Sequence, residues 1–128
     1  ITLFEHEFIR NFIHIQDVAS VFEFMIDNYD KHQTYIFNVG LSDTNINKQQ
    51  LVERIQNYIP NTSVTYSDYF VDPDKRDYVV SNEKIESTGW KPHYDLDHGI
   101  KELIQAYQMI VPHESSRYRN AFPLGYGV

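Results

Sequence analysis

Apolar residues recur at helical spacing in three segments of this chain. The spacing i, i+3, i+4, i+7 places side chains on one face of a helix, and that face is expected to be buried. The apolar positions are Val18, Val21, Phe22, Met25, Ile26 and Tyr29 in the first segment, Leu51, Val52, Ile55, Tyr58 and Ile59 in the second, and Ile100, Leu103, Ile104 and Tyr107 in the third. The pattern therefore predicts three amphipathic helices.

Polar residues mark the start of each predicted helix. Asp17 is the predicted N-cap of the first, because its carboxylate can accept hydrogen bonds from the free amides of the first turn. Asn47 opens the second helix, and Gln50 three positions later completes a capping-box pattern. The third helix is predicted to begin near Asp95 or Asp97.

Short apolar runs between the helical segments predict strands. These runs are rich in β-branched and aromatic residues, which fit a pleated surface, and they cover residues 1–4, 8–15, 34–39 and 63–66, with a further extended piece at 78–80. Residues 82–88 are predicted to form a short helix that ends at Gly89, where a left-handed conformation costs little. So few short strands do not make a sheet that is stable by itself, and we expect the chain to depend on a neighbouring domain.

These elements define the fold class as mixed α/β, with a few short strands and three or four helices. Residues 1–112 are predicted to form one folded region, and residues 113–128, which show no periodicity, an irregular C-terminal tail. The chain begins with Ile1 inside a strand-like run, and we therefore expect it to be a fragment of a longer protein.

Composition narrows the classes of partner. The net charge of −7 argues against a nucleic acid or an anionic membrane surface as the main partner. The 128 residues contain no cysteine, which excludes disulfides and thiolate metal sites. No apolar run approaches the roughly 18 residues that a membrane span needs. A cytoplasmic location is therefore expected.

The sequence lacks several motifs that carry chemistry. Its five glycines cannot be assembled into a glycine-rich loop that would bind a dinucleotide or a nucleoside triphosphate. None of its ten tyrosines is followed by Lys four residues later, so a Tyr-x-x-x-Lys acid–base pair is missing. The six histidines form no i, i+4 pair on a helix, and a metal site is not expected. We therefore predict no catalytic residue and no metal ligand within this chain.

Two segments carry cations that could bind an anionic ligand. Arg10 stands at the edge of a predicted strand that leads into a capped helix, where its guanidinium could hold two phosphate oxygens. Arg76, helped by Lys75, lies in a charged turn and could reach the same diphosphate. The alternative for Arg10 is a plain surface position, and the alternative for the turn is a solvated loop with local ion pairs.

Two further residues are expected to have structural roles. Gly40 is expected to allow a tight turn or close approach, and Trp90 is expected to anchor packing beside a helix end.

Five segments, taken in order, resemble a known family. They are RNFIHIQDVA, YIFNVG, LVERI, DPDKRDYVVSNEKIESTGWKP and DLDHGIKELIQAY. Together they resemble the C-terminal part of extended short-chain dehydrogenases/reductases, most closely the nucleotide-sugar epimerases and dehydratases. The resemblance implies that Arg10 and Arg76 are the two arginines that contact the nucleotide diphosphate. Asn11 stands where the family more often has Asp, which removes a charge and puts an ion-pair role at this position in doubt.

The resemblance also implies a division of labour. The family joins a Rossmann domain that binds NAD or NADP to a smaller, mainly C-terminal part that binds the nucleotide-diphosphate sugar. Its enzymes oxidise the sugar transiently at C4, with a Tyr–Lys pair as the acid–base group, and the full-length protein is expected to be a homodimer. Because the glycine-rich loop and the Tyr–Lys pair are absent here, this chain alone is predicted to bind no cofactor and to be inactive. A small non-enzymatic α/β interaction module is the alternative.

Overall fold

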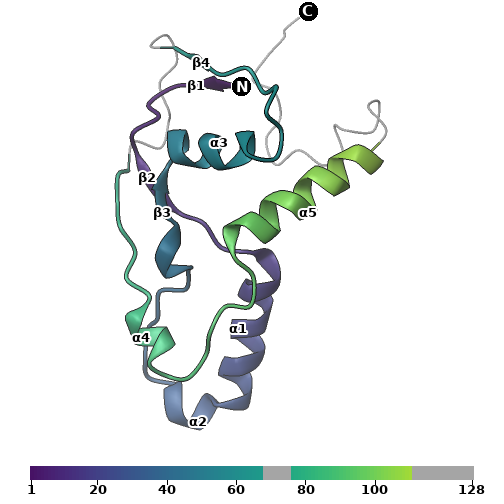
Figure 1. Ribbon diagram of the computed structural model, residues 1–128. Coiled ribbons are helices and arrows are strands. Elements are labelled where there is room, and N and C mark those ends of the chain that lie inside the picture. The colour runs from purple at the N-terminus through teal and green to yellow at the C-terminus, as the bar shows by residue number, and fades with distance from the viewer. Residues whose placement is uncertain (68–75, 111–128) are drawn as a thin grey trace, which may run out of the picture.

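The computed structural model describes residues 1–67 and 76–110 as a mixed α/β chain, which confirms the predicted fold class (Figure 1). The upper part of Figure 1 holds α3 and the paired strands β1 and β4, the lower part holds α1, α2 and α4, and β2 and β3 connect the two. In chain order the elements are β1 (Thr2–Leu3), β2 (Ile9–Asn11), α1 (Ile15–Asp27), α2 (Tyr29–His32), the 3-10 turn η1 (Ser42–Thr44), β3 (Asn45–Asn47), α3 (Lys48–Gln56), β4 (Thr65–Tyr66), α4 (Glu83–Glu86) and α5 (Leu96–Met109).

The strands of the described residues form two separate pairs. Strands β1 and β4 are parallel, with Thr2 opposite Thr65. Strands β2 and β3 are antiparallel, with Arg10 opposite Ile46. Two-stranded pairs of this length depend on packing against other elements for their stability.

Residues 34–39 do not form the predicted strand. Their described hydrogen bonds to residues 81–84 use side-chain donors and not strand pairing. Lys84 Nζ donates to the Ile36 carbonyl at 2.8 Å, and Asn38 Nδ2 donates to the Ser81 carbonyl at 3.4 Å. Ile36 is 87% exposed. The prediction was wrong because an extended segment becomes a strand only when a second strand pairs with its backbone.

Helix α1 begins earlier than predicted, and its N-cap is His14 rather than Asp17. The Nδ1 atom of His14 accepts from the Gln16 amide at 3.2 Å, which fills the capping role. Asp17 lies in the first turn and is completely buried. Its carboxylate accepts from the backbone amides of His93 and Tyr94 at 2.8 and 3.1 Å, so it ties the start of α1 to the segment before α5.

The main core lies between α1 and α4. Val21, Ile85 and Trp90 are buried together there, and the Trp90 indole also donates to the Ser20 hydroxyl at 3.2 Å. Trp90 is therefore the packing anchor that the sequence predicts. Only part of each predicted apolar helix face is buried, however, and the exposed members are Phe22, Ile26, Tyr29, Tyr58, Ile59, Leu103 and Tyr107.

The helix ends follow the sequence closely elsewhere. Asn47 and Gln50 form the predicted capping box at the start of α3. Asp95 caps α5, and Gly89 follows α4 with the predicted positive φ, here 97°. Among the described residues, no helix combines the length and the apolar character that crossing a bilayer requires. The predicted tail, residues 113–128, lies outside the described part of the chain.

Candidate functional site

The site is built where β2 meets the segment that begins at Arg76. Nη1 of Arg10 donates to its neighbour's carbonyl, that of Ile9, at 2.8 Å, and it also donates to the backbone carbonyl of Arg76. In the opposite direction, the Asp77 carboxylate accepts from the Ile9 amide at 2.8 Å. Two contacts therefore hold residues 76 and 77 against β2.

Aromatic rings flank the Arg10 guanidinium. Its Cζ atom lies 5.4 Å from the ring centroid of Tyr78 and 6.0 Å from that of Phe8. Both distances lie within the range in which a cation is attracted to the face of a ring. The guanidinium is therefore held between polar contacts to the backbone and contacts to aromatic side chains.

A further pair of hydrogen bonds holds the other end of this segment, which comprises residues 76–80. Asn45 of β3 donates through Nδ2 to the Val80 carbonyl at 2.9 Å, and its Oδ1 accepts from the Val80 amide at 2.8 Å. This pair of bonds imitates the way one strand pairs with another. Residues 76–80 are thus attached to β2 near their start and to β3 at their end.

Asn11, the last residue of β2, is held by hydrogen bonds to Leu41, and Gly40 lies against it. Asn11 Nδ2 donates to the Leu41 carbonyl at 2.8 Å, and the Leu41 amide donates to Asn11 Oδ1 at 3.1 Å. A Cβ atom on Gly40 would lie 1.9 Å from Asn11 Oδ1, so the close approach requires glycine, as predicted. The amide of Asn11 both donates and accepts, which a carboxylate at this position could not do.

The structure therefore brings the Arg10 side chain to the backbone of Arg76, and the role of the two guanidinium groups in binding phosphate stays a prediction. Arg10 is half-buried and Arg76 is exposed. Lys75, the third predicted cation, lies outside the described residues. Asp77 and Tyr78 also belong to this site, and no sequence pattern indicates them, because no spacing rule links them to a strand so far away in the chain.

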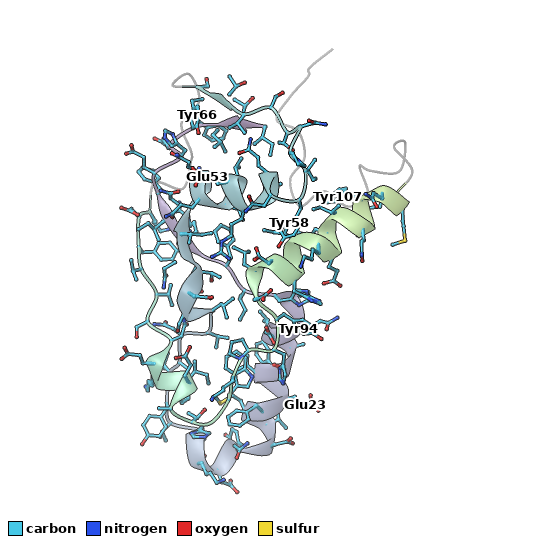
Figure 2. All side chains as sticks on the ribbon, in the orientation of Figure 1. Glu23, Glu53, Tyr58, Tyr66, Tyr94 and Tyr107 are labelled. Atoms are coloured by element: carbon cyan, nitrogen blue, oxygen red, sulfur yellow. The ribbon has the colours of Figure 1, made fainter. Side chains whose placement is uncertain are left out.

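A second cluster lies where α1 and α5 meet. Nε2 of His14 contacts the Glu102 carboxylate, and the His14 ring lies 4.5 Å from the ring of Tyr94; Figure 2 shows Tyr94 at this junction. A cavity of about 550 Å³ opens beside it. Apart from His14, Asp95 and Glu102, its lining is apolar, and it is formed mainly by residues 12–15, which follow β2, and by α3 and α5. His14 thus joins two helices at the edge of an apolar cavity.

Comparison with known proteins identifies the relatives of this chain. A dTDP-D-glucose 4,6-dehydratase from Mus musculus is 28% identical over 106 residues, which cover 77% of this chain and 29% of that protein. A CDP-abequose synthase from Salmonella typhimurium is 29% identical over 105 residues, which cover 77% of this chain and 34% of that protein. No model of a protein family matches the chain.

Solved structures show the same relationship at the level of the fold. A dTDP-glucose 4,6-dehydratase from Bacillus anthracis, in complex with NAD, matches 84% of this chain and 34% of its own with a TM-score of 0.64 and 22% identity. A GDP-D-glycero-L-gluco-heptose synthase from Campylobacter jejuni, in the presence of NADPH, matches 85% of this chain and 33% of its own with a TM-score of 0.66 and 20% identity.

These findings confirm the resemblance inferred from the sequence. The chain is related to the nucleotide-sugar dehydratases and epimerases of the extended short-chain dehydrogenase/reductase family, whose enzymes carry a Rossmann fold. It spans about a third of the length of the curated relatives that it matches.

Proposed function

We propose that this chain is the sugar-nucleotide-binding part of an NAD(P)-dependent nucleotide-sugar epimerase or dehydratase. The observation that carries the proposal is the contact between Arg10 and the backbone of Arg76. The contact joins the Arg10 side chain to the backbone of a second cationic residue, 66 positions away in the chain, and this proximity supports a shared ligand. A pair of guanidinium groups can bind the oxygens of a diphosphate with several charge-assisted hydrogen bonds. Lys75 belongs to the same proposal as an additional cation.

The diphosphate is the feature that the relatives' substrates have in common. The names of the relatives refer to dTDP-, CDP- and GDP-linked sugars, which differ in both the base and the sugar. A site made from arginine side chains and backbone groups recognises phosphate oxygens and leaves the base undetermined. The proposed ligand of this chain is therefore a nucleotide-diphosphate sugar.

The chain would contribute binding and orientation to the reaction. A nicotinamide cofactor, NAD or NADP, would supply the hydride acceptor for transient oxidation of the sugar at C4. Arg10 and Arg76 would hold the diphosphate and thereby fix the position of the attached sugar, which lowers the entropic cost of reaching the reactive geometry. The sequence of this chain contains no Tyr-x-x-x-Lys pair, so the acid–base step is assigned to a Rossmann domain outside it.

An exposed apolar face supports a docked Rossmann domain. Ile15, Phe22 and Ile26 are exposed side by side along α1 at 75%, 67% and 74%, and they flank the face that packs on the core. Segment 34–39, which pairs with no strand among the described residues and includes exposed Ile36, follows α1 and α2 in the chain. Several exposed large apolar side chains on one face of a helix are typical of an interface. We propose that this face packs against the cofactor-binding domain. We also propose that the full-length enzyme is cytoplasmic and forms a homodimer.

Calorimetric titration of the chain tests the proposal. We expect dTDP, CDP, GDP or UDP to bind measurably, and the corresponding monophosphate to bind at least tenfold more weakly, because it lacks one of the two phosphates. We also expect no turnover of the corresponding sugar nucleotides by the chain alone. Equal affinity for mono- and diphosphates, or binding of none of them, would contradict the proposal and favour an interaction module.

A further inference from the structure

We propose that Asp77 and Tyr78 are positioning residues that hold the Arg10 guanidinium in place for the diphosphate. The inference rests on the proposed function, since it assigns the neighbours of one of its two arginines. It also adds to that function, because neither residue is a cation that could bind phosphate itself. Their contribution would lie in the orientation of Arg10 before the ligand arrives.

Asp77 acts on the backbone of β2. Its Oδ1 atom accepts from the Ile9 amide at 2.8 Å, one residue before Arg10. On the other side of β2, Ile9 lies opposite Asn47 of β3. The Asp77 carboxylate therefore takes the place of a further strand at this edge of β2. Because Asp77 is held there, the carbonyl of the preceding residue, Arg76, lies within reach of the Arg10 side chain.

Tyr78 acts on the guanidinium itself. The two carbonyl contacts of Nη1 fix one edge of the guanidinium plane, and the Tyr78 ring lies 5.4 Å from its Cζ atom. An unrestrained arginine side chain loses rotamer entropy when it is immobilised. Restraining Arg10 beforehand removes part of that cost from ligand binding.

The charge of Asp77 makes it possible to distinguish a positioning role from a direct electrostatic effect on the ligand. A carboxylate close to a diphosphate site lowers the affinity for the anion, so its presence here calls for a compensating benefit. Asn retains the acceptor oxygen and removes the charge, whereas Ala removes both. If Asp77 acts by holding the Ile9 amide, D77N should bind the ligand at least as tightly as the original chain, and D77A should bind it more weakly.

Two measurements test the inference on D77A, D77N, Y78L and Y78F. Hydrogen exchange of the Ile9 amide reports the Asp77 contact directly, and we expect at least tenfold faster exchange in D77A but not in D77N. Calorimetry with dTDP, CDP and GDP should show about tenfold weaker binding for D77A, equivalent to about 1.4 kcal/mol. Binding should be two- to fivefold weaker for Y78L, while Y78F keeps the ring and the affinity. E23A, which changes one charge on the exposed side of α1, is the control, and Glu23 is labelled in Figure 2.

The outcomes distinguish the inference from the function on which it rests. If R10A weakens diphosphate binding and D77A does not, the positioning role is overturned and the proposed function stands. If D77N weakens binding as much as D77A, charge rather than the hydrogen bond matters, and the inference is again overturned. If neither R10A nor R76A changes the affinity, the diphosphate site itself is wrong. Unchanged exchange of the Ile9 amide in D77A overturns the positioning role whatever the ligand does.

Discussion

Nη1 of Arg10 donates a hydrogen bond to the backbone carbonyl of Arg76, although 66 residues separate them in the chain. Further contacts attach residues 76–80 to the paired strands β2 and β3. The Ile9 amide donates to Asp77, Asn45 forms two hydrogen bonds with Val80, and the Arg10 guanidinium lies near the Tyr78 ring. The geometry of the proposed diphosphate site therefore depends on how these strands hold a segment that itself has no regular secondary structure.

Replacing Asp17 tests the link between α1 and the segment before α5. Its buried carboxylate accepts from the amides of His93 and Tyr94, and D17A would leave both without this acceptor. We expect D17A to lower the free energy of unfolding by about 3 kcal/mol and D17N by about half as much. Urea denaturation followed by circular dichroism measures the change. D27A, at an exposed position of the same helix, should change it by less than about 0.5 kcal/mol.

Equal urea midpoints for D17A and the original chain would show that the two amides need no acceptor. The segment before α5 would then be held by other contacts, of which the Trp90 packing is the strongest candidate.

Replacing Gly40 and Gly99 by alanine should change the free energy of unfolding in opposite directions. In G40A the new Cβ would meet Asn11 Oδ1 at 1.9 Å, so Asn11 must leave its clamp on Leu41, and we expect a loss of about 2 kcal/mol. Gly99 lies inside α5, and within the described part of the chain its Cβ would meet only His14 Cδ2, at an ordinary 3.5 Å. G99A should therefore stabilise the chain by up to about 1 kcal/mol through its higher helix propensity. Thermal unfolding compares the two variants.

The double variant N11A/G40A provides the control for this comparison. It removes the obstructing side chain, so adding G40A to N11A should cost clearly less than adding G40A to the original chain. Equal costs in the two backgrounds would mean that Asn11 is not what excludes a side chain at position 40.

Neighbouring apolar residues on α1 should differ sharply in their importance for stability. Val21 is 5% exposed and packs in the core, whereas Phe22 is 67% exposed. V21A should lower the free energy of unfolding by about 2 kcal/mol, and F22A should change it by less than about 0.5 kcal/mol. F22A should also reduce binding of a hydrophobic dye to the folded chain. If F22A destabilised the chain as much as V21A, Phe22 would belong to the core and not to an interface.

Features that depend on neighbouring residues could be predicted from the sequence. The Asn47–Gln50 capping box, the cap at Asp95 and the left-handed Gly89 each follow from side-chain and backbone preferences within a few positions. Trp90 was also predicted correctly as a packing anchor, because a lone large apolar side chain beside a helix end needs a core to fill.

Features that depend on distant partners could not be predicted from the same patterns. An aspartate at a helix start is typical of an N-cap, yet the amides that Asp17 binds lie 76 and 77 residues away. Periodicity identifies Phe22 and Ile26 as apolar but does not distinguish burial in this chain from burial against another domain. Residues 34–39 have the composition of a strand and lack a pairing strand among the described residues.

The site shows the same limit. Spacing alone favoured separate surface roles for Arg10 and Arg76, and only the family resemblance indicated that they belong together. The contact from Asp77 to the Ile9 amide has no signature in the sequence, because a backbone amide of any residue type could take that position.

A double-mutant cycle on Arg10 and Arg76 tests the central claim most directly. The affinity for dTDP, CDP or GDP would be measured by calorimetry for the original chain, R10A, R76A and the double variant, with R54A as a control on α3. We expect each single variant to bind about 10- to 100-fold more weakly, as the loss of charge-assisted hydrogen bonds implies. The double variant should lose less than the two losses combined, because both side chains bind one diphosphate. Unchanged affinity in both single variants, or losses no larger than that of R54A, would contradict the account.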